Sequence, residues 1–158
     1  MQTGRILHLP ASIDASWRVG IVYSSHYEEE TCKLVDAAKK TLIKGGLKET
    51  NVTLHAVPGA FEIPLLGAAL AAEERVDGLI ALGIIVEGET HHADLIAKEA
   101  ARGVMDVQVQ FRVPFAFEVL YVRKLTQAKA RSAGGSNKGE EAAVTVLYSL
   151  AQLRRLQS

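Results

Sequence analysis

Apolar and polar positions along the chain follow two periods, one typical of strands and one of helices. The longest apolar run is 79–86, where Gly83 is the only residue that is not apolar. A continuous run of this length predicts a strand buried on both faces, as in parallel sheets. The segment 88–90 then predicts a tight turn, and Thr90 is able to cap a helix that begins near His91.

The same periods predict three more strands and five helices. The strands are predicted at 17–23, 52–56 and 114–122. The helices are predicted at 28–44, 60–74, 92–110, 125–131 and from Asn137 onward, where Asn137 and Glu140 are a candidate capping pair. The body of the second helix, 65–74, is rich in alanine and leucine, and we expect it to be well buried. Because strands alternate with helices, the chain predicts an α/β fold with a four-stranded parallel sheet and helices on both faces.

The first 16 residues lack a clear period, and we expect residues 1–16 to form an N-terminal arm before a single domain at 17–158. An open sheet of four strands has two exposed edges. The arm is therefore a candidate to pair with an edge in a neighbouring subunit.

Composition narrows the classes of function. The chain has 158 residues, 48% of them hydrophobic, and 18 basic residues balance 18 acidic ones. No basic block is interleaved with aromatics, so nucleic acid is not an expected partner. No apolar run resembles a signal peptide or approaches bilayer length, so we expect a soluble, cytoplasmic protein without a membrane partner. A single cysteine, Cys32, argues against a thiolate metal site, and we expect Cys32 to be a small core residue of a helix.

Candidate chemistry lies directly after the strand at 79–86. Ligands of parallel sheets collect at the carboxyl ends of strands, where helix N-termini attract anions. His91 and His92 follow this strand, and histidine carries protons near neutral pH. The sequence therefore places proton-transfer chemistry where an anionic substrate would be held.

Three ordered motifs resemble those of the lumazine synthases of riboflavin biosynthesis. They are 57–64 (Val-Pro-Gly-Ala-Phe-Glu-Ile-Pro), 88–92 (Gly-Glu-Thr-His-His) and 137–139 (Asn-Lys-Gly), and the likeness extends from about Arg18 to Leu150. The resemblance implies a flavodoxin-like three-layer sandwich. It also implies a homopentamer or a multiple of pentamers, up to an icosahedral shell, with active sites between adjacent subunits.

The reaction implied by the resemblance is a transferase reaction on two small molecules. It joins 5-amino-6-(D-ribitylamino)uracil to 3,4-dihydroxy-2-butanone 4-phosphate, releases phosphate and water, and yields 6,7-dimethyl-8-ribityllumazine. This is the penultimate step of riboflavin biosynthesis. No metal and no organic cofactor is implied.

The resemblance also implies roles for individual residues. The catalytic residues are His92, as the proton carrier, and Arg131, which also binds phosphate together with Glu89 and Thr90. The implied substrate-binding residues are His26, Tyr27, Ala60, Phe61, Glu62, Ile84, Ile85, Val86, Phe117 and Lys138. Glu62 would face the ribityl hydroxyls, and Phe117 would line the pocket across a subunit boundary. His91 points in a different direction from its neighbour and is treated as non-catalytic.

From the sequence alone, several of these residues could instead have a purely structural role. Phe61, Ile84 and Phe117 are equally typical of core packing. Arg131 and Lys138 are equally typical of solvated helix ends. These alternatives stay open at the level of the sequence.

The chain departs from the family pattern at three places. His26 and Tyr27 stand where the family usually has a stacking phenylalanine or tryptophan, so the stacking residue is open. Position 87 is commonly basic and is Glu87 here. The loop 132–136 is about one residue shorter than usual and lacks a lysine found in many members, which is compatible with a shell.

Two alternative functions remain at this stage. One is an archaeal-type riboflavin synthase, which shares the fold and binds lumazines. The other is a non-catalytic flavin- or lumazine-binding or shell-forming scaffold, for which His26 and Glu87 are the relevant departures. Turnover distinguishes them, whereas assembly size does not.

Overall fold

The computed structural model describes residues 8–158, and within them four parallel strands form one sheet in the order β2-β1-β3-β4. The strands are β1 (Val19–Ser24), β2 (Val52–Val57), β3 (Gly78–Val86) and β4 (Phe115–Val122). The helices are α1 (Glu28–Lys44), α2 (Ile63–Ala72), α3 (His92–Phe111), α4 (Leu125–Arg131) and α5 (Lys138–Gln157). Short 3-10 turns are η1 (Glu49–Asn51), η2 (Ala60–Glu62) and η3 (Gly134–Ser136).

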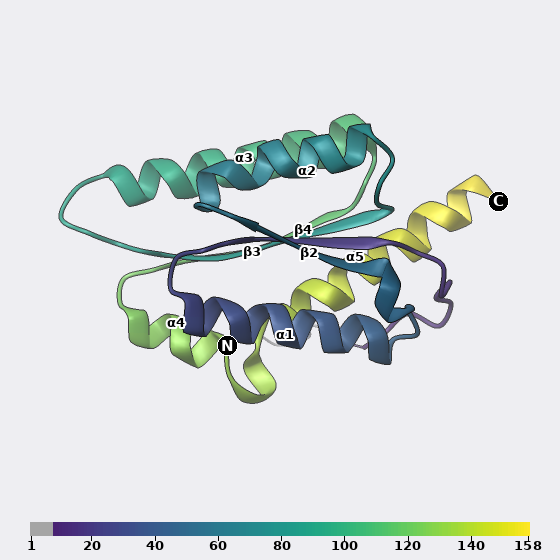
Figure 1. Cartoon of the computed structure of the whole chain (residues 1–158), viewed down its shortest axis with the longest axis horizontal. Helices are drawn as coiled ribbons and strands as arrows, with labels where there is room; N and C mark the ends of the chain where they lie inside the picture. Colours follow the sequence, from purple (N-terminus) through teal and green to yellow (C-terminus); the bar gives the residue numbers. More distant parts are fainter. Residues whose placement is uncertain (1–7) are drawn as a thin grey trace.

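The sheet lies between two helical layers. Figure 1 shows α2 and α3 on one face and α1, α4 and α5 on the other. The predicted α/β three-layer architecture with a four-stranded parallel sheet, consistent with a flavodoxin-like fold, is confirmed. Helices connect strands that run in the same direction, as parallel pairing requires.

The central strand β3 organises both halves of the core. All its residues from Gly78 to Ile85 are buried, as the apolar run predicted. Ile80 and Leu82 pack with the α1–α5 layer, whereas Leu79 and Ala81 pack with the α2–α3 layer. This alternation follows from the strand period of two. Because of this alternation, only every second side chain of a strand can face a site on the α2–α3 side of the sheet.

Two predictions about burial were wrong. Helix α2 buries only Ile63, Gly67 and Ala71, and Leu65 is 75% exposed. Leu66 and Leu70 pack only partly against the core, and Leu65 lies on the opposite, exposed side of the helix. Cys32 is exposed as well, because α1 buries a stripe that Cys32 does not belong to.

The described part of the N-terminal arm lies against its own chain. Leu9 and Ile13 pack on the core, and the backbone nitrogen of Lys48 donates to the Ala15 carbonyl at 3.3 Å. Residues 1–7 lie outside the described residues. Pairing of the arm with a neighbouring subunit therefore stays a prediction. Within 8–158, no helix is both long and apolar enough to cross a membrane.

Candidate active site

The loops that follow β1, β2 and β3 meet at the carboxyl end of the sheet and line a groove of about 760 Å³. Segments far apart in the sequence come together there, between η2 and the start of α3. The predicted site residues that line it are His26, Tyr27, Ala60, Phe61, Glu62, Ile84, Ile85, Val86 and His92. The structure thus gathers nine of the candidate residues into one concave surface.

The first wall of the groove is the loop after β1. Tyr27 has a left-handed backbone (φ 51°) and is the residue before α1. The hydroxyl of Thr31 donates to the His26 carbonyl at 2.8 Å, which ties this loop to the first turn of the helix. Ser25 donates to the Val57 carbonyl from both its backbone nitrogen and its hydroxyl, at 3.0 and 2.8 Å. The side chains of His26 and Tyr27 both line the groove. That one of their rings stacks on a substrate stays a prediction.

The second wall follows β2. A Cβ added at Gly59 would lie 3.2 Å from Oε2 of Glu62 and 3.7 Å from the His26 ring. Because Gly59 has no side chain, the Glu62 carboxylate and the His26 imidazole can both pack against its backbone. Phe61 is 62% exposed, so it is not a core residue. Its ring is available to a ligand or to another protein surface.

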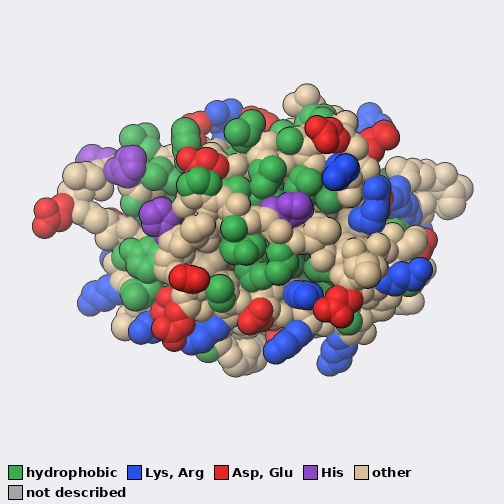
Figure 2. Space-filling model, in the orientation of Figure 1, with side chains coloured by type: hydrophobic (Ala, Val, Ile, Leu, Met, Phe, Trp, Pro, Cys, Tyr) green, Lys and Arg blue, Asp and Glu red, His purple; other side chains and the backbone are tan. Residues whose placement is uncertain are grey.

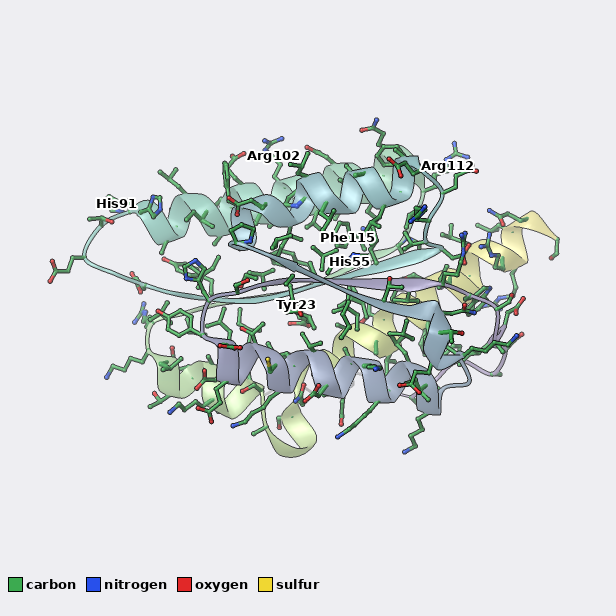
Figure 3. All side chains as sticks on the ribbon, in the orientation of Figure 1. Tyr23, His55, His91, Arg102, Arg112 and Phe115 are labelled. Carbon is green, nitrogen blue, oxygen red and sulfur yellow. The ribbon has the colours of Figure 1, made fainter. Side chains whose placement is uncertain are left out.

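The third wall is the end of β3 with the start of α3. Ile84 is 2% exposed and borders both the core and the groove. Helix α3 begins at His92, as the predicted helix 92–110 does, and the His92 backbone nitrogen donates to the Thr90 hydroxyl at 3.4 Å. The preceding residue His91 caps the helix without a side-chain hydrogen bond and lies at its outer end (Figure 3). The first backbone amides of a helix lack partners within the helix, and such helix starts commonly bind anions.

The turn that leads into α3 is exposed. Glu89 and Thr90 lie on it beside the groove, although neither forms part of its lining. The backbone nitrogen of Glu87 donates to the Val122 carbonyl at 2.8 Å, and its carboxylate is 3.9 Å from Nε of Arg123. Glu87 therefore directs its charge toward the end of β4.

Three predicted site residues are not brought to the groove of their own chain. Phe117 lies on the edge strand β4 and is 36% exposed. Arg131 ends α4, where its guanidinium donates to the Gln127 carbonyl at 3.0 Å. The Lys138 ammonium is 2.7 Å from a Glu141 carboxylate oxygen, and both side chains are largely buried. None of the three lines the groove.

The groove also contains residues that sequence reasoning missed. Glu99 lines it from the same face of α3 as His92, seven residues or about two helical turns later, and this spacing could have revealed it. A hydrogen bond from Arg102 at 2.6 Å lowers the pKa of Glu99. Ser24, the last residue of β1, lies beneath the first wall. Among residues 8–158, no three His, Cys, Asp or Glu side chains are grouped to hold a metal ion.

A parallel α/β sheet with a largely apolar groove at the carboxyl ends of its strands, and with a few converging polar groups, defines a small-molecule-binding protein of the α/β class. Comparison with known proteins narrows this class. The model of one family, described as 6,7-dimethyl-8-ribityllumazine synthase, matches residues 16–154. The chain belongs to the 6,7-dimethyl-8-ribityllumazine synthase family.

Two relatives carry that same name. One, from Ruthia magnifica subsp. Calyptogena magnifica, is 37% identical over 150 residues, which are 91% of this chain and 90% of the relative. The other, from Vesicomyosocius okutanii subsp. Calyptogena okutanii (strain HA), is 37% identical over 139 residues, 84% of this chain and 83% of the relative. A solved structure of a de novo designed Rossmann fold protein aligns over 72% of this chain and 91% of its own, at 21% identity with a TM-score of 0.37. That last likeness is too low to support any conclusion.

Proposed function

We propose that this protein condenses 5-amino-6-(D-ribitylamino)uracil with 3,4-dihydroxy-2-butanone 4-phosphate to 6,7-dimethyl-8-ribityllumazine, with release of phosphate and water. The observation that carries the proposal is the meeting of the segments 26–27, 58–62 and 84–86 with His92 in one groove. Family membership favours this reaction over that of an archaeal-type riboflavin synthase. The presence of His92 in the groove favours an enzyme over a non-catalytic scaffold.

The pyrimidine would lie between the first and third walls. The flat pyrimidine ring would stack against the ring of His26 or Tyr27. Its polar edge would form hydrogen bonds with backbone groups of 60–61 and 84–86. The Glu62 carboxylate accepts hydrogen bonds only, which suits the hydroxyls of a ribityl chain. The wide groove leaves room for that chain beside Gly59.

The chemistry needs protons moved between neighbouring atoms. The 5-amino group attacks the ketone carbon and water leaves, which forms an imine. A proton then leaves the adjacent carbon, phosphate departs, and the ribityl-bearing nitrogen closes the second ring with loss of another water. His92 borders the groove and would carry these protons as a general acid and base.

The phosphate would bind at the start of α3. The backbone amides of Glu89 and Thr90 lie where the helix dipole favours negative charge, and the Thr90 hydroxyl adds a donor. A guanidinium matches two phosphate oxygens at once, and we assign this role to Arg131 of an adjacent copy. Lys138, whose ammonium is 2.7 Å from a Glu141 carboxylate oxygen, would contribute positive charge to substrate binding.

We propose that the active protein is a homo-oligomer, a pentamer or a multiple of pentamers, in the cytoplasm. Large apolar side chains are exposed over the α2–α3 layer and at the rim of the groove, and Figure 2 shows hydrophobic side chains at the surface there. They are Phe61, Leu65, Leu95, Met105 and Val109, each more than half exposed. A monomer rarely exposes so many on one side. In such an assembly Phe117 and Arg131 of one copy would complete the groove of the next.

The test is direct. Purified protein mixed with both substrates should form lumazine, followed by its fluorescence, faster than the uncatalysed background and in proportion to protein concentration. Sedimentation of the same sample should give a mass that is a multiple of five chains. A folded protein that binds the pyrimidine but forms no lumazine would overturn the enzymatic proposal and favour the scaffold.

A further inference from the structure

Ser24 ends β1 and is 1% exposed, yet its hydroxyl has no hydrogen-bond partner among the described residues. Among residues 8–158, its Oγ is the buried side-chain oxygen or nitrogen atom left without a partner. The same residue lines the groove of the candidate active site. A buried hydroxyl without a partner is unfavourable, because it has lost its bonds to water.

The neighbouring hydroxyl groups make the contrast clear. Ser25 donates to the Val57 carbonyl at 2.8 Å, and Thr31 donates to the His26 carbonyl at 2.8 Å. Both bonds hold the loop that forms the first wall. Ser24, one position before this loop, makes no such bond among residues 8–158 and lines the groove.

The position of Ser24 depends on the strand beside it. Ser24 is two residues after Val22, which packs in the α2–α3 half of the core, so both side chains point to the side of the sheet where the groove lies. On β3, a Cβ added at Gly83 would lie 2.8 Å from Oγ of Ser24. The missing side chain at Gly83 therefore gives the hydroxyl its space at the floor of the groove, next to Ile84.

We propose that Ser24 is a further substrate-binding residue, whose hydroxyl completes its hydrogen bonding with a polar atom on the edge of the bound pyrimidine. This inference rests on the proposed function. A serine hydroxyl both donates and accepts, so it suits the alternating N–H and C=O groups of a uracil ring. Rotation about its Cα–Cβ bond moves Oγ between staggered positions, which brings a ring at the groove floor within reach.

The inference predicts opposite effects on binding and stability when the hydroxyl is removed. Ser24→Ala should weaken pyrimidine binding by roughly three- to tenfold, the range expected for one net hydrogen bond. The same substitution should leave the Tm of the ligand-free protein unchanged or raise it, because an unpaired buried hydroxyl disappears. A hydroxyl with a purely structural role would show the reverse of both.

The experiment compares Ser24→Ala with the wild-type oligomer at equal protein concentration. The probe is the ribitylamino pyrimidine with a nitro group in place of the 5-amino group, which cannot condense, and its Kd is measured by calorimetry. Steady-state assays should show a raised KM for the pyrimidine and an unchanged KM for the phosphorylated substrate. Ser132→Ala is the matched control for stability, since it removes a buried hydroxyl that donates to the Lys129 carbonyl at 3.2 Å, and it should lower Tm.

Each outcome decides between the inference and the proposed function. Normal turnover with an unchanged Kd, or a lower Tm for Ser24→Ala, overturns the role of Ser24 and leaves the proposed function intact. Failure of the wild-type protein to bind the probe or to turn over substrates overturns the proposed function, and the absence of binding removes this inference with it. Weaker binding together with an equal or higher Tm supports it.

Discussion

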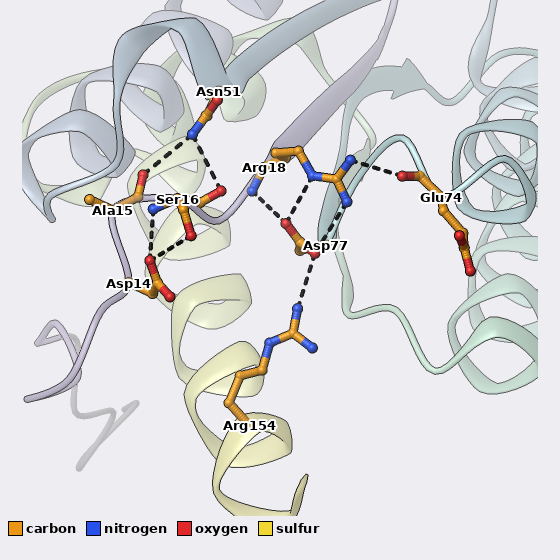
Figure 4. Close-up of polar contacts among 8 residues, drawn as sticks. All are labelled: Asp14, Ala15, Ser16, Arg18, Asn51, Glu74, Asp77 and Arg154. Atoms are coloured by element: carbon orange, nitrogen blue, oxygen red, sulfur yellow. Dashed lines mark hydrogen bonds and ion pairs between the residues drawn. The ribbon is translucent and has the colours of Figure 1, made fainter. Parts of the chain in front are cut away.

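The two ends of the sheet use polar residues in opposite ways. At the amino end, Asp77 accepts hydrogen bonds from the backbone and the guanidinium of Arg18, at 2.8 and 3.2 Å, and from Arg154 of α5 at 3.0 Å (Figure 4). Arg18 also donates to the Glu74 carbonyl at 2.9 Å. At the carboxyl end, the hydroxyl of Ser24 lacks a partner and the turn before α3 is exposed.

This difference separates residues that hold the fold from residues that are free to bind. The network around Asp77 joins β1, the loop before β3 and the last helix, so its groups are satisfied within the chain. At the other end, the Ser24 hydroxyl and the exposed turn 87–90 are left for a ligand or a second copy. Substitutions at the carboxyl end should therefore reduce activity with little change in stability, and substitutions at the amino end should do the opposite.

The largest effect is expected for His92→Ala at the carboxyl end. The rate of lumazine formation should fall by about 10² to 10⁴-fold, the usual contribution of general acid–base catalysis, while Tm stays near that of the wild type. Residual activity is expected, because substrate positioning persists. His91→Ala is the matched control from the same helix start and should retain most of the activity. Equal losses in both variants would remove the specific role of His92.

The next effect is expected for Arg131→Ala. The KM for the phosphorylated substrate should rise by roughly 10- to 100-fold, as for a lost charge-assisted hydrogen bond, while the KM for the pyrimidine changes little. Steady-state titration of each substrate against a saturating level of the other measures this. Within its own chain the Arg131 guanidinium donates to the Gln127 carbonyl of the same short helix, so folding should be retained without it. Parallel weakening of both substrates would indicate a defect in assembly instead.

At the amino end, Asp77→Ala should lower stability and leave the KM values unchanged. The substitution removes the acceptor of the Arg18 backbone nitrogen and of two guanidinium groups, which should cost about 1 to 3 kcal/mol. Thermal unfolding at a fixed protein concentration measures it. Asp106→Ala removes an exposed partner of Arg102 and should change Tm little. An Asp77→Ala protein that keeps its stability but loses activity would contradict the structural role assigned to the amino end of the sheet.

The smallest expected effect is a change in the pH dependence of stability when His55, on the edge strand β2, is replaced. Partial burial lowers the pKa of His55 below its ordinary value. The unfolded chain therefore binds a proton more readily than the folded chain, so stability falls as pH decreases through the ordinary histidine range of about 6.5. His55→Gln should flatten this part of a Tm-versus-pH curve between pH 7 and 5. An unchanged slope would assign the acid sensitivity to other groups.

The sequence was sufficient to predict the fold, because its strands and helices have distinct periods. The apolar run at 79–86 became the buried strand β3, and the predicted helix 28–44 is α1 with the same ends. The burial of α2 could not be predicted, since an alanine- and leucine-rich helix has the same composition whether it faces its own core or another chain. The exposed Leu65 is the clearest example.

The candidate site could be predicted only in part. The segments around Glu62 and His92 both follow parallel strands, so they must lie at the same end of the sheet, and the structure places both in one groove. Ser24 was missed, since no pattern marks a serine at the end of a strand as unpaired. Arg131 and Phe117 were predicted from the resemblance, and the single chain does not bring them to the groove.

The most direct test of the shared site is to mix the two impaired variants, His92→Ala and Arg131→Ala. The two proteins are dissociated, combined in equal amounts and reassembled, and lumazine formation is measured at limiting phosphorylated substrate. If the groove of one copy uses Arg131 of the next, about one quarter of the interfaces in a randomly mixed ring regain both residues. The account therefore predicts that activity rises to about a quarter of the wild-type value. Activity no greater than the average of the two variants, from an oligomer that has exchanged its subunits, would contradict it.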